Sequence, residues 1–300
     1  MNSFRLSLAV LLLPIILVGA RSLPDSADEV SIVVTVLDKK GWPVSDLTKE
    51  EFVLVENKEP QELTSLSPTL QTPLTVALLL DISGSRRDHM PGAETEAAIG
   101  FFRQVLSKDD QGMLVAFHED PELVADLTSD AARLETALLR LRTIRPRGST
   151  GALRAMDAVI ESRLKNPQGL KSIVIVSDCL DNVETTTLQR VVDQLQRNNI
   201  SAYVIRLAAP GVLRGRDRRA GITFANKLTE ETGGFSVEVS AKNQFEEAFG
   251  LIAQTLKGRY VLSYSPKNAK RDGSFRRITI ETTRKGTKVL TRKGYYAPKG

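Results

Sequence analysis

The 300-residue sequence has few of the residues that build most catalytic and metal centres. A single cysteine, Cys179, excludes an internal disulfide and any zinc or iron–sulfur site that needs several thiolates. Two histidines argue against a His-rich metal site and against a histidine-based catalytic triad. Any chemistry must therefore depend on Asp, Glu, Ser, Thr, Lys or Arg side chains.

The remaining composition is that of an ordinary globular chain. Apolar residues make up 41% and charged residues 26%, which excludes a polytopic membrane protein and a mostly disordered one. The counts of 20 glycines and 13 prolines exclude collagen-like and low-complexity classes. The length allows one or two domains.

The net charge of +5 is unevenly distributed along the chain. Residues 23–70 carry ten acids and four bases, whereas residues 257–300 carry thirteen bases and two acids. A basic tail can bind nucleic acid or an anionic surface. We favour another interpretation, in which the acidic and basic segments meet in one small domain, and we expect no nucleic-acid partner.

The first twenty residues have the pattern of a secretory signal peptide. Arg5 precedes an apolar run over 6–20 that ends in the small residues Gly19 and Ala20. Fifteen residues are short for a membrane-spanning helix, which needs about 20. An uncleaved anchor is the alternative. We expect an exported chain, periplasmic, cell-surface or secreted, with no stable membrane span after cleavage.

Hydropathy divides the rest of the chain into three segments. Largely apolar runs at 74–80, 172–178 and 201–208 alternate with amphipathic helical patterns and predict buried parallel strands. Alternating patterns at 30–57 and after residue 258 predict antiparallel strands. The predicted fold class is therefore α/β, with a mainly parallel central sheet and a small β-module formed by the N- and C-terminal segments. The predicted division is a signal peptide at 1–20, an N-terminal β-segment at 21–73, an α/β domain at 74–258, and a C-terminal β-segment at 259–300 that pairs with 30–57.

Oxygen-bearing side chains occur at the ends of two predicted strands and in a loop that precedes a predicted helix. Ligands of open α/β sheets bind beyond the carboxyl ends of the strands, so these side chains should gather at one edge. Carboxylates and hydroxyls suit a hard cation such as Mg²⁺ or Mn²⁺. The candidate ligands are Asp81, Ser83, Ser85, Thr150 and Asp178. Each could instead have a purely structural role, such as capping the helix that follows.

The segments DISGS (81–85), GST (148–150) and VSD (176–178) resemble the metal-ion-dependent adhesion site (MIDAS) of von Willebrand factor type A domains. The resemblance covers about 74–258, and the flanking β-segments resemble bacterial exported VWFA-related proteins. It implies a Rossmann-like fold, with Ser83, Ser85 and Thr150 contacting the metal and Asp81 and Asp178 holding it directly or through water. Cys179 departs from the family's usual glycine, and its larger side chain could tighten the loop or approach the metal.

The sequence and the resemblance together favour a binding module and not an enzyme. A metal that keeps an open position can accept a carboxylate from a protein partner, as in cell adhesion, and Arg86, Arg87, Arg145 and Arg147 would attract acidic partners. A metal-dependent phosphohydrolase of the haloacid dehalogenase type is the alternative, but that class needs an acidic residue where Ser83 stands. Binding of an anionic surface by the basic tail is a third hypothesis.

Three other segments near the predicted edge have simpler interpretations. Residues 118–120 (His-Glu-Asp) are expected to be a solvated loop and not a second metal site. Asp181 is expected to form a turn with Asn182. The basic segment 214–219 is expected to be a surface loop, since it lacks the phosphate-loop pattern.

Overall fold

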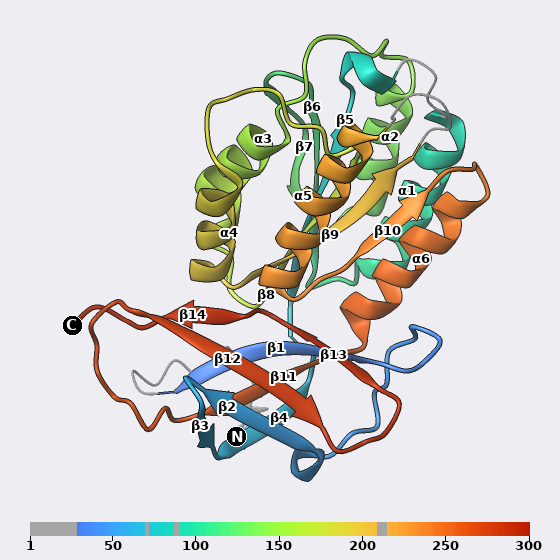
Figure 1. The fold of residues 1–300 in the computed structure, drawn as a ribbon. Helices are drawn as coiled ribbons and strands as arrows, with labels where there is room; N and C mark the ends of the chain where they lie inside the picture. The colour runs from blue at the N-terminus through green and yellow to red at the C-terminus, as the bar shows by residue number, and fades with distance from the viewer. Residues whose placement is uncertain (1–28, 70–71, 87–90, 209–214) are drawn as a thin grey trace, which may run out of the picture.

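The structure, a computed structural model, describes residues 29–69, 72–86, 91–208 and 215–300 (Figure 1). The predicted signal peptide at 1–20 lies outside these residues. Within the part that is described, no helix combines the length and the apolar character needed to cross a bilayer.

Strands and helices alternate through the middle of the chain, and strands alone make up its two ends. The strands are β1 (Val30–Leu37), β2 (Phe52–Glu56), β3 (Glu59–Gln61), β4 (Leu63–Pro68), β5 (Leu74–Asp81), β6 (Gln111–Phe117), β7 (Pro121–Thr128), β8 (Leu170–Ser177), β9 (Ile200–Leu207), β10 (Ser236–Val239), β11 (Arg259–Tyr264), β12 (Phe275–Thr282), β13 (Lys288–Thr291) and β14 (Gly294–Tyr296). The helices are α1 (Pro91–Val105), α2 (Ala131–Leu141), α3 (Ala152–Val159), α4 (Leu188–Arg197), α5 (Arg216–Thr232) and α6 (Gln244–Lys257).

The central sheet has the strand order β10-β9-β8-β5-β6-β7 and is parallel except for β7, which runs antiparallel to β6. Every residue of β5 and β9 is buried, which explains why their sequences are largely apolar. Helices α1, α2 and α6 pack on one face and α3, α4 and α5 on the other. This arrangement confirms the predicted α/β class with a mainly parallel sheet.

The two chain ends form a second unit, the β-module, which packs against the amino edge of the central sheet (Figure 1). Its two antiparallel sheets have the orders β13-β1-β11-β4 and β14-β12-β2-β3, and they share one apolar core. Antiparallel sheets flanking the parallel one were part of the predicted fold class. Opposite charges also meet here: Arg284 forms ion pairs with Asp46 and Glu51.

A buried polar cluster lies inside the β-module. The hydroxyls of Tyr264 and Tyr295 donate to one carboxylate oxygen of Glu56, at 2.6 and 2.8 Å. The guanidinium of Arg276 lies 3.3 Å from the other oxygen, and both charged side chains are almost fully buried. Because a buried charge is tolerated only with partners, this cluster fixes the relative position of β2, β11, β12 and β14.

Two buried arginines join the β-module to helices of the α/β domain. Arg259 Nε donates to the carbonyl of Leu256, in the last turn of α6. Arg292 Nη1 donates to the carbonyl of Gln196, in the last turn of α4, and its Nη2 donates to Ser31 in β1. Carbonyls at a helix C-terminus have no partner within the helix and carry partial negative charge, so a cation is favourable there.

Asp110 binds groups from both ends of the α/β domain. Its carboxylate accepts hydrogen bonds from the backbone amide of Leu74, where β5 begins, and from Ser107. It also lies 3.3 Å from the ammonium of Lys257, the last residue of α6. The two points at which the chain passes between the units are therefore held together at one buried carboxylate.

Two segments differ from the sequence prediction. Residues 59–68 were not predicted to form strands, yet they form β3 and β4. Asn57 and Lys58, both with positive φ, form a tight turn into β3, and β4 pairs with β11. Residues 216–219 were predicted to be loop but form the first turn of α5, where all four side chains are exposed and leave no apolar stripe to detect.

We predict that Asp110→Asn destabilises the chain in a pH-dependent way. Burial raises the pKa of Asp110, but hydrogen bonds from Ser107 and Leu74, with the charge of Lys257, outweigh it and hold the pKa below the ordinary 3.8. The native state therefore favours the charged carboxylate. Its contribution is complete above pH 3.8 and is lost as the pH falls through the lowered native value.

Urea unfolding should show a deficit of roughly 1.5–3 kcal/mol for Asp110→Asn at pH 7, narrowing below pH 4. The neighbouring exposed Asp109→Asn serves as the control and should change stability by less than about 0.5 kcal/mol. A deficit for Asp110→Asn that stays constant between pH 7 and pH 3 would contradict this assignment.

Candidate metal centre

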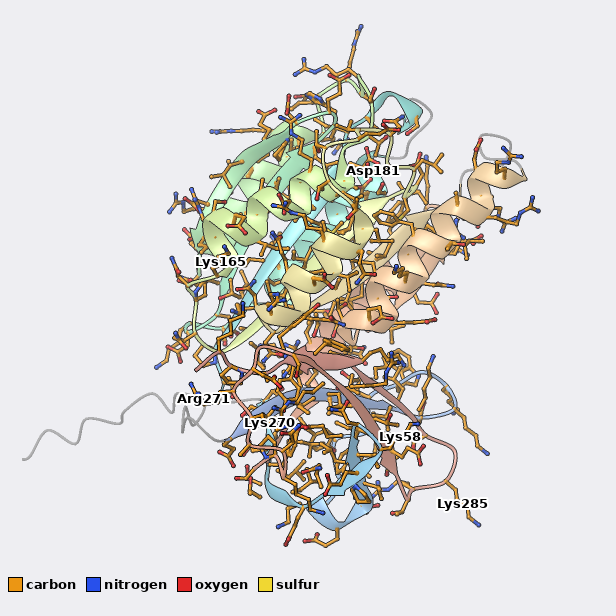
Figure 2. The ribbon with its side chains drawn as sticks, turned by 60° about the vertical axis from the view of Figure 1, so that its left-hand side comes forward. Lys58, Lys165, Asp181, Lys270, Arg271 and Lys285 are labelled. Atoms are coloured by element: carbon orange, nitrogen blue, oxygen red, sulfur yellow. The ribbon has the colours of Figure 1, made fainter. Side chains whose placement is uncertain are left out.

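The carboxyl ends of the parallel strands lie at the edge of the sheet farthest from the β-module. Strand β5 ends at Asp81 and β8 ends at Ser177. Figure 2 shows Asp181, three residues after Asp178, at this end of the molecule, whereas Lys58 and Lys285 mark the β-module at the other end. The candidate site and the β-module are therefore at opposite ends of the sheet.

Three hydroxyls form a chain of contacts at this edge. Thr150 Oγ1 donates to Ser83 Oγ at 3.0 Å, and Ser83 Oγ lies 3.1 Å from Ser85 Oγ. Ser83 and Thr150 are buried, whereas Ser85 is exposed. The structure thus brings three of the predicted ligands together, from two separate loops, in a line that runs from the interior to solvent.

The two predicted carboxylates are buried and oriented by nearby donors. Asp81 accepts hydrogen bonds from the backbone amide of Ser83 at 2.8 Å and from the hydroxyl of Ser177 at 2.6 Å. Asp178 Oδ1 accepts from the backbone amide of Leu180 at 3.0 Å. Ser177 was not predicted to take part, and only its position before Asp178 at a strand end could have indicated it.

Backbone contacts hold the loop of Ser83 against the loop of Thr150. The amide of Gly84 donates to the carbonyl of Gly148 at 2.9 Å, and the amide of Arg147 donates to the carbonyl of Ile82 at 2.9 Å. A Cβ on Gly84 would lie only 3.1 Å from the Gly148 carbonyl oxygen, so a glycine permits this approach.

Asn182 fixes Thr150 from the other side. The amide of Thr150 donates to the Asn182 side chain at 2.7 Å, and the amide of Asn182 donates to the carbonyl of Thr150 at 2.9 Å. Sequence analysis assigned Asn182 only to a turn with Asp181. Asp181 also accepts from the amide of Leu153 at the start of α3, and burial raises its pKa.

Residues 118–120 support the Thr150 loop. The carbonyl of His118 accepts from Gly151 at 2.6 Å, and Asp120 pairs with Arg154 at 2.7 Å. Among the described residues, no group of three or more His, Cys, Asp or Glu side chains could hold a metal ion. The candidate centre therefore depends on hydroxyls as well as carboxylates.

The structure describes the side chains of two of the four arginines that were predicted to attract acidic partners. These two, Arg145 and Arg147, are exposed near the edge. The side chains of Arg86 and Arg87 lie outside the described residues. Neither Arg145 nor Arg147 forms an ion pair with an acidic residue of the described part of the chain.

Cys179 occupies a backbone conformation that favours glycine. Its φ is 62°, in the left-handed region, and its side chain is buried beneath α5. Its amide donates to the hydroxyl of Ser177 at 3.0 Å, which is the hydroxyl that binds Asp81. The side chain therefore belongs to the packed core, and backbone strain here is compatible with a tight loop after Asp178.

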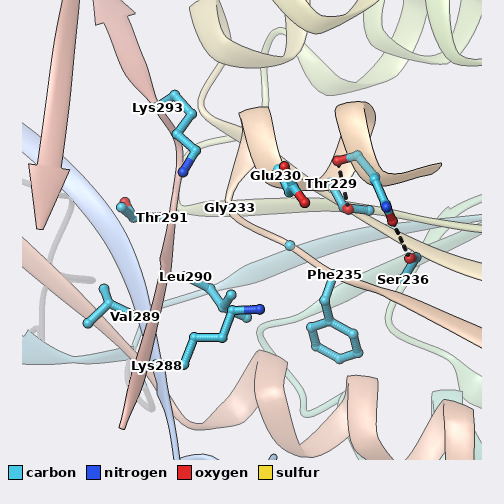
Figure 3. A pocket seen from close by; sticks show the side chains of 12 residues that line it. Thr229, Glu230, Gly233, Phe235, Ser236, Lys288, Val289, Leu290, Thr291 and Lys293 are labelled. Carbon is cyan, nitrogen blue, oxygen red and sulfur yellow. Dashed lines mark hydrogen bonds between the residues drawn. The ribbon is translucent and has the colours of Figure 1, made fainter. Parts of the chain in front are cut away.

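A cavity of about 400 Å³ lies at the far end of α5, between the α5–β10 turn and β13 (Figure 3). Lys288, Lys293 and Glu230 line it, and Asn226 bonds to Ser236 at its wall. It contains none of the five predicted ligands. It belongs to the boundary between the two units and not to the candidate centre.

We predict that the Cys179 thiol is unreactive in the folded chain. Burial raises its pKa well above the ordinary range, and the thiolate is the reactive form. Labelling with a disulfide reagent at pH 8 should be at least about a hundredfold slower in the native chain than in concentrated urea. A Cys179→Ala/Ser162→Cys variant, with the thiol on an exposed helical position, is the control and should label rapidly. Fast labelling of the native wild type would contradict the burial assigned to Cys179.

Comparisons with known proteins agree with this architecture. Residues 76–180 match the family model of the von Willebrand factor type A domain. No curated protein matches the sequence. A von Willebrand factor type A structure from Catenulispora acidiphila is 13% identical, with a TM-score of 0.50; the match covers 92% of this chain and 75% of that one.

Proximal thread matrix protein 1 from the mussel byssus, in a structure described as having a zinc-occupied MIDAS motif, is 14% identical with a TM-score of 0.52. That match covers 66% of this chain and 48% of the mussel chain, so it spans about half of the mussel protein. At these identities the structures show a shared fold alone. The matched segment and the topology of the central sheet identify the chain as one that carries a von Willebrand factor type A domain.

Proposed function

We propose that this chain is an exported protein-binding module that captures an acidic residue of a partner protein through a divalent metal. The proposed ligands are Asp81, Ser83, Ser85, Thr150 and Asp178. The observation that carries the proposal is the hydroxyl chain of Thr150, Ser83 and Ser85 beside the buried carboxylate of Asp81.

The donor set fits a hard cation. Three hydroxyl oxygens and two carboxylates offer oxygen alone, which suits Mg²⁺ or Mn²⁺ better than a metal that prefers nitrogen or sulfur. A divalent cation held there would act as a Lewis acid that accepts a carboxylate oxygen from outside. The interior residues orient the ligands: Ser177 and the Ser83 amide hold both oxygens of Asp81.

The exposure of the ligands sets the direction of approach. Ser85 is exposed, whereas the other four ligands are buried, so among the described ligands it is Ser85 that a partner can approach from solvent. Arg145 and Arg147 lie on the exposed edge and would raise the local concentration of acidic partners. Electrostatic attraction of this kind mainly increases the association rate.

The family supports an interaction role more broadly. A von Willebrand factor type A domain implies a protein-interaction or adhesion module, and the mussel relative is described with a zinc-occupied MIDAS motif. We propose that the domain extends over 74–258 and that the apolar run at 6–20 directs export. We also propose that the chain is not an enzyme, since the carboxylates and hydroxyls of the five ligands would all be occupied in holding the metal. The phosphohydrolase alternative gains no support, because Ser83, two residues after Asp81, stands where that class needs an acidic residue.

Calorimetric titration of Mg²⁺ and Mn²⁺ into the metal-free chain tests the proposed centre. We expect saturable one-site binding that is lost in Asp81→Ala. Thr150→Val, which removes one hydroxyl and keeps the shape, should weaken binding at least about tenfold. Ser149→Ala is the matched control, since the neighbouring hydroxyl takes no part in the contacts of Ser83, and it should bind like the wild type. Absence of binding in the wild type, even with added acetate to complete the coordination, would overturn the proposal.

Ser177→Ala tests the orienting role of the hydroxyl behind Asp81. All five ligands remain in this variant, but Asp81 loses the 2.6 Å hydrogen bond and the Cys179 amide loses its acceptor. We expect metal affinity to fall about 10- to 100-fold, as is typical when a group that orients a ligand is removed. Ser162→Ala, on the exposed surface of the segment after α3, should leave the affinity unchanged. Wild-type affinity in Ser177→Ala would show that Asp81 needs no such support.

A further inference from the structure

A groove of about 950 Å³ lies beside the candidate metal centre. One wall is the segment that follows β8, residues 179–187, and the other is the first half of α5. Apolar atoms of Leu153, Leu180, Val183 and Phe224 form its interior. Two of these residues lie close to proposed ligands in the sequence. Leu153 is three residues after Thr150, and Leu180 is two residues after Asp178.

The groove and the metal centre share a structural element. Asn182 lines the groove and also makes two hydrogen bonds with the backbone of Thr150, at 2.7 and 2.9 Å. The groove therefore adjoins the Thr150 loop of the candidate centre. A partner segment that extended from the captured carboxylate across this loop would reach the mouth of the groove.

The charge of the groove is acidic. Asp181, Glu184 and Asp217 line it, and none of the described residues that line it is a lysine or arginine. On α5 the lining positions are Asp217, Ala220 and Phe224, which are spaced along one helical face. The basic residues of the same turn lie outside the lining, and Arg218 is paired with Glu238 at 2.9 Å.

An apolar interior with an acidic rim fits one kind of side chain. Lysine and arginine have an apolar stem and a cationic end, so the stem can contact Phe224 and Val183 while the charge lies near Glu184 and Asp217. An acidic group would be repelled, and a purely apolar one would leave both carboxylates unpaired. We propose that this groove binds a basic side chain of the partner, a few residues from the carboxylate that the metal centre captures. This inference depends on the proposed function.

Paired synthetic peptides test the proposal. Each capped peptide carries one Asp and one Arg, separated by one to four Gly or Ser residues, and its twin has neutral citrulline in place of Arg. Dissociation constants are measured in Mg²⁺ and in chelator for the wild type, for Glu184→Gln/Asp217→Asn, and for Glu122→Gln/Asp109→Asn. The last variant removes two exposed carboxylates that do not line the groove, so it matches the change in net charge.

We expect an Arg peptide of one spacing to bind the wild type about tenfold more tightly than its citrulline twin. Glu184→Gln/Asp217→Asn should lose this preference and keep the affinity for the citrulline peptide, whereas the control variant should keep both. If citrulline peptides bind only in Mg²⁺ and Arg gives no advantage at any spacing, the groove proposal is wrong and carboxylate capture stands. If no peptide binds in Mg²⁺, the proposed function fails and the groove proposal fails with it.

Discussion

The carboxylate of Asp110 holds together the two places where the chain passes between the α/β domain and the β-module. The first passage leads into Leu74 and the second leads out of Lys257, and Asp110 contacts both residues. The β-module takes its strands from both ends of the chain, so it can form only when these two passages lie close together. A single buried group is sufficient here since its hydrogen bonds come from rigid backbone as well as from side chains.

The boundary between the units is then completed by buried arginines. Arg259 and Arg292 bind the last turns of α6 and α4, and neither is hydrogen-bonded to a carboxylate of the described part of the chain. Burial lowers the pKa of Arg292 to about 10, still well above neutral pH, so its charge persists. Because these helices cover opposite faces of the sheet, the β-module is fixed to both layers, and the two units are expected to move as one body.

Sequence patterns predict the parts of this fold whose residues carry a strong periodic or apolar signal. The buried strands at 74–80 and 201–208 are examples, since burial on both faces favours a largely apolar sequence. Strand β4 gave no such signal, because LTSLSP is half polar and its stability comes from pairing with β11, nearly 200 residues away. The five proposed ligands come from motif and strand-end position, and their metal binding remains a prediction. The supports contributed by Ser177 and Asn182 arise only from folding, since each bonds to a residue far away in the sequence.

The arrangement of the β-module has a consequence for the order of folding during synthesis. Ser31 in β1 contacts Ser263 in β11, 232 positions later. At typical elongation rates, roughly 10–50 s separate the appearance of these two residues, and β1 has no strand partner in that interval. Closing so long a loop from an unfolded chain is slow. Once the inserted domain has folded, however, its ends are already joined at Asp110, so the nascent β1 and β11 meet as if they were neighbours. The α/β domain would thus bring together the two ends of the chain that form the β-module.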